Sequence, residues 1–192
     1  MRNLVMRLSI LDIAAEGPVL AGAIPGSNLR AKMIPKLALE TEVQPLFLDF
    51  KGIEVATSSY LQQGILELRD HCRKFFPHLY PVVANATDYV TEELEKLLQY
   101  HSEAILTCKL DGRGKVSAVS VLGVLEEKQE LTLEAVKSLG VVNAAILMQK
   151  CKEKDPIGVT GWNNRLSGLA SKGLLMETKK GRTKIYQLVL EM

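Results

Sequence analysis

The sequence predicts a mixed α/β protein with two domains, an α/β domain over residues 1–125 and a smaller domain over residues 130–192. As far as residue 125, short apolar runs alternate with stretches whose apolar residues recur every three or four positions, which is the pattern of strands alternating with helices. The acidic, polar segment EEKQE (126–130) then marks a linker. Beyond it, three helical patterns precede two strand-like runs, with no further strand–helix alternation.

Apolar runs bounded by turn residues predict the strands of the first domain. MRLSILDI (6–13) and PVLAGAI (18–24) have the composition of short strands. PLFLDF (45–50) is apolar almost throughout, which is typical of a central strand covered on both faces. Three further strands are predicted over YPVVANA (80–86), AILTCKL (104–110) and VSAVSVLG (116–123).

Helical periodicity fills the intervals between these strands. GSNLRAKMIPKLALE (26–40) predicts a helix capped by Ser27 or Asn28, with a kink or restart at Pro35, which lacks an amide hydrogen. A second helix is predicted over residues 59–75 and a third over residues 88–100. The second helix carries one apolar stripe, made of Leu61, Ile65, Leu68, Cys72 and Phe75.

The composition, 47% hydrophobic and 24% charged, is ordinary for a soluble globular protein. No apolar run reaches the roughly 18 residues of a membrane span, and the N-terminal MRNLVMRLSI lacks the features of a secretory leader. We therefore expect a cytoplasmic protein with no membrane segment. The three cysteines, Cys72, Cys108 and Cys151, lie far apart without a CxxC pair, so neither disulfides nor a metal site is predicted. No cofactor is predicted either.

The net charge of +2 conceals an asymmetry between the two predicted domains. Residues 1–129 carry 14 Lys and Arg against 16 Asp and Glu, whereas residues 130–192 carry 10 against 6, a net charge of +4. An anionic partner would therefore meet the C-terminal part, although a solvated basic surface is also consistent with so modest a charge.

The second domain is predicted to consist of three helices and a hairpin. The helices cover TLEAVKSLG (132–140), NAAILMQKCKEK (143–154) and residues 160–173, and the hairpin joins LLMETKK (174–180) to TKIYQLVLE (183–191). The segment GWNNRLSGLASKGLL (161–175) resembles the third helix and its exit in winged helix-turn-helix domains. That resemblance covers about the last third of the chain, and it implies a helix that enters a DNA major groove beside a basic wing.

Helical spacing divides the third helix into an apolar and a polar side. The apolar side contains Trp162, Leu166, Leu169, Ala170 and Gly173, and Trp162 is predicted to be a core residue. Asn on the polar side can pair with adenine, and the cations of the hairpin would bind phosphates. The predicted DNA-binding residues are Thr160, Asn163, Asn164, Arg165, Ser167, Ser171 and Lys172 of the helix, and Lys179, Lys180, Arg182 and Lys184 of the hairpin. Solvation of the polar side, or docking of a protein there, is the alternative.

One segment of the first domain resembles the STAS domains of bacterial anti-sigma factor antagonists. The segment is LDFKGIEVATSSYLQQGIL (48–66), in which an apolar strand ends in Asp49 and two serines, Ser58 and Ser59, open a helix. The resemblance covers most of residues 8–123 in element order and is closest to an uncharacterised STAS-like family. It implies phosphorylation of Ser58 by a partner kinase, or partner docking at Ser58, Ser59 and Asp49. Thr57 and Tyr60 depart from the family pattern, which has Asp and Gly at these positions.

Structural capping is the alternative for these hydroxyls. Ser59 and Gln62 have the spacing of a capping box, Thr57 or Ser58 would also serve as a cap, and Asp49 would stabilise a turn. Catalysis is not predicted. Ser58 and Asp49 with one of three histidines would supply the residue types of a triad, but no GxSxG motif surrounds the serine and His71, His78 and His101 lie outside any motif.

Taken together, these features predict a bacterial or phage transcriptional regulator. A STAS-like domain would respond to a ligand or to a protein partner such as a histidine-kinase-like ATPase, and a winged helix would bind double-stranded DNA, with a homodimer left open. The alternative is a protein-interaction adaptor in a partner-switching system, which binds no DNA.

Overall fold

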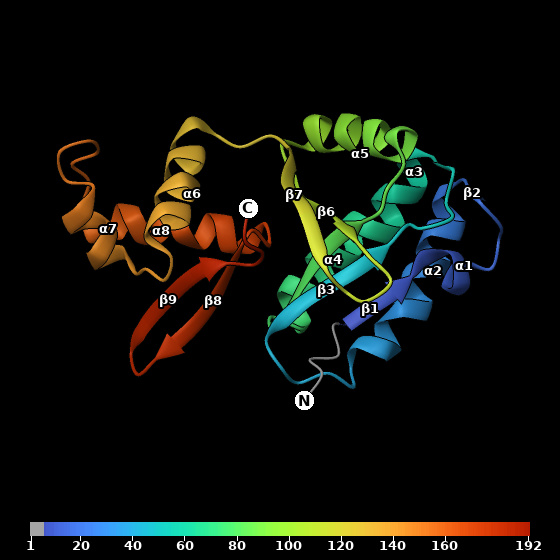
Figure 1. Cartoon of the computed structure of the whole chain (residues 1–192), viewed down its shortest axis with the longest axis horizontal. Coiled ribbons are helices and arrows are strands. Elements are labelled where there is room, and N and C mark those ends of the chain that lie inside the picture. The colour runs from blue at the N-terminus through green and yellow to red at the C-terminus, as the bar shows by residue number, and fades with distance from the viewer. Residues whose placement is uncertain (1–5) are drawn as a thin grey trace. The chain divides into compact units, whose positions relative to one another are not determined.

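The structure is a computed structural model of the whole chain and describes residues 6–192. Residues 1–5 lie outside the described residues, and they include the start of the N-terminal segment that is predicted not to be a secretory leader. The chain divides into two compact units, the first ending at Val124 and the second beginning at Leu125. The two units are coloured blue to yellow and yellow to red in Figure 1.

A five-stranded sheet with helices packed against it forms the first unit, which confirms the predicted mixed α/β character (Figure 1). The strand order is β1-β3-β5-β6-β7, in which the first four strands are parallel and the last is antiparallel to its neighbour. Every residue of β5 is buried, and so are the last four residues of β3, which confirms the prediction of a central strand. The strands are β1 (Met6–Ser9), β3 (Gln44–Asp49), β5 (Leu79–Ala84), β6 (Ala104–Leu110) and β7 (Val116–Gly123).

Helices and one small additional sheet complete this unit. Two short strands, β2 (Val19–Leu20) and β4 (Val55–Ala56), pair in parallel outside the main sheet. The segment after β4 is helical from Ser58 to Phe75 but contains a π-helical turn. The helical elements are α1 (Ile10–Ala14), α2 (Ala23–Leu37), α3 (Ser58–Leu61), η1 (Gln62–Leu66), α4 (Glu67–Phe75) and α5 (Asp88–His101).

Two of the predicted strands are shorter than expected. The strand predicted over residues 6–13 ends at Ser9, because the Ser9 hydroxyl accepts a hydrogen bond from the Asp12 amide and caps α1. The strand predicted over residues 18–24 ends at Leu20. Gly22 then adopts φ +91°, which turns the chain into α2.

Helix α2 and the helical segment after β4 also differ from prediction. Helix α2 begins at Ala23, so Ser27 and Asn28 lie inside it and do not cap it, and it continues without a restart through Pro35. Pro35 lies in the last turn of this helix, which ends two residues later, at Leu37. Phe75 is 57% exposed, whereas the other four residues of its predicted stripe are buried, since α4 ends at this position.

Two glycines allow α2 and the segment after β4 to pack closely. A Cβ atom on Gly26 would lie 2.6 Å from the carbonyl oxygen of Tyr60, and one on Gly64 would lie 3.2 Å from the carbonyl oxygen of Gly26. Backbone atoms therefore occupy the space that a larger side chain would need. Tyr60, next to this contact, is fully buried.

The second unit contains three helices and one antiparallel hairpin. Helix α8 packs against α6, α7 and β8, and an isolated bridge joins Val142 to Tyr186 of β9. The first helix begins five residues before its predicted start, inside the segment predicted as a linker, because Glu126 and Gln129 form a capping box there. The elements are α6 (Glu127–Leu139), α7 (Ala144–Lys150), α8 (Val159–Ser171), β8 (Leu175–Lys180) and β9 (Thr183–Leu188).

The close approach of α2 predicts that Gly26→Ala destabilises the first unit. The added methyl group would push against a backbone carbonyl, and we expect a net loss of about 1 to 2 kcal/mol after the gain in helix propensity. Urea unfolding followed by far-UV circular dichroism measures this loss. Gly112→Ala is the control, since a Cβ atom there meets no atom within 4 Å, and an equal effect of both variants would contradict the prediction.

Candidate nucleic-acid interface

Helix α8 exposes the polar side that the sequence predicts. Trp162, Leu166, Leu169 and Ala170 are buried, as the helical spacing predicts. The opposite side, which we call the polar face of α8, carries amide and hydroxyl groups and no charge. It consists of Thr160, Asn163, Asn164, Ser167 and Ser171, all of which are exposed.

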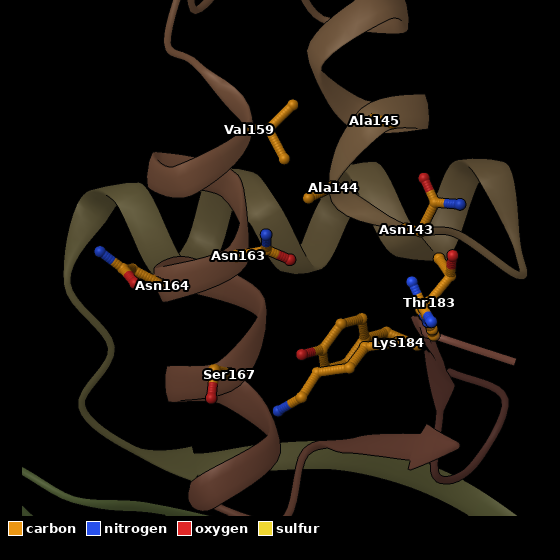
Figure 2. Close-up of a pocket in the computed structure, with 11 residues that line it drawn as sticks. Asn143, Ala144, Ala145, Val159, Asn163, Asn164, Ser167, Thr183 and Lys184 are labelled. Carbon is orange, nitrogen blue, oxygen red and sulfur yellow. The ribbon is translucent and has the colours of Figure 1, made fainter. Parts of the chain in front are cut away.

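The polar face borders a groove of about 620 Å³. Figure 2 shows Asn163 and Ser167 on successive turns of α8, with Asn163 pointing towards α7 and Asn164 pointing away from it. The hairpin borders the groove on another side. The lining residues are Asn143, Ala144, Ala145, Val159, Asn163, Asn164, Ser167, Arg182, Thr183, Lys184 and Tyr186.

The tip of the β8–β9 hairpin, residues 179–184, is strongly basic. Lys179 lies directly opposite Lys184 in the register, and Gly181 adopts φ +62° at the turn. Two like charges in opposite positions destabilise a hairpin unless an anion lies nearby. Glu177 supplies one such anion, 2.9 Å from the Lys184 ammonium nitrogen. Within residues 6–192, Lys179, Lys180 and Arg182 make no ion pair, so three cations remain exposed to a ligand.

Arg165 has a different place from the one predicted for it. Its guanidinium forms an ion pair with Asp155, and the Arg165 side chain is only 12% exposed. Its guanidinium carbon also lies 5.1 Å from the centre of the Trp162 ring. Arg165 therefore fastens the loop before α8 to the helix instead of standing on the polar face. Of the other predicted contact residues on α8, Ser171 donates a hydrogen bond to the Gly168 carbonyl, and Lys172 is half-buried just after the helix.

Six of the eleven residues that line the groove were not among the predicted contacts, and Asn143 and Thr183 are two polar ones of these six. The Asn143 side chain caps α7 by accepting a hydrogen bond from the Ile146 amide, and Thr183 begins β9. The cap could have been found from Asn143 preceding an apolar helical pattern. Its place in the same groove as Asn163 depends on the packing of α7 against α8, which no local signal in the sequence indicates.

The first unit places Asp49 in a network at the carboxyl ends of its parallel strands. Arg7 donates to Asp49 from Nε at 2.7 Å, Asn85 donates from Nδ2 at 2.8 Å, and the Lys51 amide donates at 3.1 Å. Asp49 is 2% exposed. The bond from the Lys51 amide stabilises the turn after β3, as predicted for Asp49. A cavity of about 490 Å³ adjoins the network, lined by Arg7, Ser9, Leu11, Asp12, Asp49, Lys51 and Gly52.

Ser58 opens α3 and is half-buried. Its hydroxyl donates a 2.6 Å hydrogen bond to Glu93 of α5, and Glu93 also accepts from Lys96. The bond from Ser58, followed by the bond and charge of Lys96, holds the pKa of Glu93 below its usual value. A phosphate on Ser58 would bring its negative charge against this carboxylate.

The structure confirms Thr57 as the N-cap residue of α3, but the predicted capping bonds of these hydroxyls are absent. The Thr57 hydroxyl instead accepts from the Gly22 amide at 3.2 Å and lies 3.3 Å from the Ser59 hydroxyl oxygen. Ser59 lies inside α3, so it cannot form the predicted capping box with Gln62.

The histidines have separate surroundings. The His71 ring is tilted against that of Phe75 with ring centres 4.7 Å apart, His78 Nε2 lies 2.9 Å from the Glu40 carbonyl oxygen, and His101 packs edge-on against Tyr100. The hydrogen bonds of Ser58 and Asp49 go to Glu93 and to the Arg7 network respectively.

The buried cysteines are poor nucleophiles. Burial raises the pKa of Cys72 to about 12 and that of Cys108 to about 11. Among residues 6–192, no cluster of three His, Cys, Asp or Glu side chains is arranged to hold a metal ion. In the same part of the chain, every helix is too short or too polar to cross a membrane.

Comparison of the sequence with protein-family models and with curated proteins, and comparison of the chain with solved structures, found no match.

The ion pair at the start of α8 predicts that Asp155→Asn destabilises the second unit. The substitution removes the anion beside a largely buried guanidinium, and we expect a loss of about 1 to 3 kcal/mol. Urea unfolding followed by Trp162 fluorescence measures it, because Trp162 is the only tryptophan of the chain. Glu153→Gln removes an exposed acid of the same loop and is the control. A loss no larger than that of the control would show that the ion pair contributes nothing.

The Ser58–Glu93 bond predicts the direction of a pKa change. Because this bond is the largest cause that lowers the pKa of Glu93, Ser58→Ala is expected to raise that pKa towards its usual value. A lowered carboxyl pKa stabilises the folded state above the unfolded pKa, and this stabilisation is lost as the pH falls through the folded pKa. Ser58→Ala should diminish it. Carboxyl titration by NMR measures the change, and Ser59→Ala, which leaves Glu93 its bond, should not alter the titration.

Proposed function

We propose that the chain is a DNA-binding regulator whose second unit is a winged helix and whose first unit is a STAS-like sensor. The observation that carries the proposal is the groove in which the neutral polar face of α8 and the basic hairpin tip meet. Exposed amides and hydroxyls suit the edges of bases, and a row of cations suits the phosphates beside them. The net charge of +4 over residues 130–192 supports an anionic partner.

The order of elements in the second unit supports the winged helix. Three helices precede one hairpin, and the Val142–Tyr186 bridge ties the segment between α6 and α7 to β9. In such a domain the third helix enters the major groove while the hairpin lies along the backbone. Arg165 is removed from the predicted contacts, because its guanidinium is paired with Asp155.

The proposed role of the first unit rests on the resemblance of residues 48–66 to STAS domains. Phosphorylation of Ser58 stays a prediction. The Ser58 hydroxyl donates a hydrogen bond to the Glu93 carboxylate, so a phosphate on Ser58 would lie next to that carboxylate and repel it. Repulsion there would act on the contact between α3 and α5, which gives the first unit a means of responding to modification.

Salt dependence tests the DNA proposal. If each of the three hairpin cations that make no ion pair binds one phosphate, affinity for a mixed-sequence duplex of about two helical turns should fall on the order of 40-fold between about 50 and 200 mM salt. Replacing Lys179, Lys180 and Arg182 together by Ala should reduce the slope of log K against log salt by about 3. Fluorescence anisotropy with a labelled duplex measures both quantities.

A matched charge change controls for the loss of net charge. Lys150, Lys152 and Lys154 are exposed cations of the same unit. None of them is among the described residues that line the groove. Their joint replacement by Ala lowers the net charge equally and should leave the slope nearly unchanged. Equal salt slopes in the two triple variants would show that the hairpin tip is not the DNA-binding surface. Absent or salt-insensitive binding by the wild type would favour the protein-interaction adaptor.

A further inference from the structure

The polar face of α8 lacks the side chains that usually recognise guanine. Arg and Lys bind the O6 and N7 atoms of guanine in the major groove, whereas Asn and Gln bind the N6 and N7 atoms of adenine. Every residue of the polar face is an amide or a hydroxyl. Asn163 and Asn164 are the two members that can make the bidentate contact, and both are exposed at the groove.

The one arginine of α8 is held away from this face. The Asp155 carboxylate neutralises the Arg165 guanidinium, which also stacks over the Trp162 ring. Moving Arg165 to a base edge would break the ion pair and leave Asp155 without its cation. Breaking a largely buried ion pair costs free energy, so Arg165 is expected to stay paired with Asp155 when DNA binds.

The cations of the groove lie on the hairpin and not on the helix. Arg182 and Lys184 come from the hairpin tip, and Lys184 is already paired with Glu177. Hairpin cations that flank a helix in the major groove face the phosphate backbone, where they contribute affinity without base discrimination. Base discrimination is therefore left to the amides of α8.

From these contacts we propose that the polar face of α8 recognises adenine, so that the DNA targets of the second unit contain A·T pairs where Asn163 and Asn164 enter the major groove. This inference rests on the proposed function and adds the class of base. The bidentate amide contact distinguishes adenine from the other three bases because only adenine presents a donor and an acceptor side by side in this arrangement.

Selection from a randomised duplex tests the inference. The full-length protein is mixed with duplexes randomised over about one helical turn between constant flanks, and the retained DNA is sequenced. We expect adenine to be enriched by about 5- to 150-fold at two positions. Asn163→Ala and Asn164→Ala should each abolish the enrichment at one position while the salt slope of general DNA binding stays unchanged. Asn163→Arg should replace adenine by guanine at its position.

Gln149→Ala is the matched control, because Gln149 is an exposed amide of α7 in the same unit and the described lining of the groove does not include it. This variant should keep the wild-type preference. Enrichment of G·C pairs, retention of DNA without any base preference, or adenine enrichment that survives both alanine variants would overturn the inference and leave DNA binding intact. Failure to retain any duplex at low salt would overturn the proposed function and this inference together.

Discussion

The burial of one side of α8 is the constraint on which the groove of the second unit depends. Trp162, Leu166 and Leu169 are almost entirely buried, so the helix cannot rotate about its axis without exposing large apolar surfaces. Each of these side chains contributes about 1.5 to 3 kcal/mol when fully buried. The cost of rotation fixes the direction in which Asn163 and Asn164 point. The buried apolar residues of α8 thus determine which polar groups the helix exposes.

A comparable constraint operates in the first unit at Asp49. A carboxylate that is 2% exposed needs compensation, and Arg7, Asn85 and the Lys51 amide supply it. Asn85 in turn exchanges hydrogen bonds with the backbone of Leu110, so the network links the carboxyl ends of β1, β3, β5 and β6. This explains why an apolar strand ends in an acid. The polar group holds neighbouring strand ends together where the hydrophobic strands stop.

Periodicity predicted which residues of a single helix or strand are buried. It did not predict the hydrogen bonds and ion pairs that join two elements. The buried and exposed sides of α8 follow from about 100° per residue, and the central strand follows from the apolar run at residues 45–50. The pairing of Arg165 with Asp155 does not follow, because ten residues and a loop separate them. The same is true of Ser58, whose position before a helical pattern suggests a cap while its hydroxyl donates to Glu93, 35 residues away. Local signals predicted the elements, and packing decided the partners of their polar groups.

The separation of charge from recognition in the second unit has a thermodynamic consequence under the proposed function. Counterion release depends on the phosphates that the hairpin cations neutralise, and those contacts are the same on any sequence. The hydrogen bonds of a neutral polar face release no counterions. Correct and incorrect targets would therefore lose affinity in parallel as salt rises, and their ratio would stay nearly constant. An arginine of α8 that bound a base would make the ratio of the two affinities depend on salt. The only arginine of the helix, Arg165, is held in an ion pair with Asp155 and does not make such a contact under this proposal.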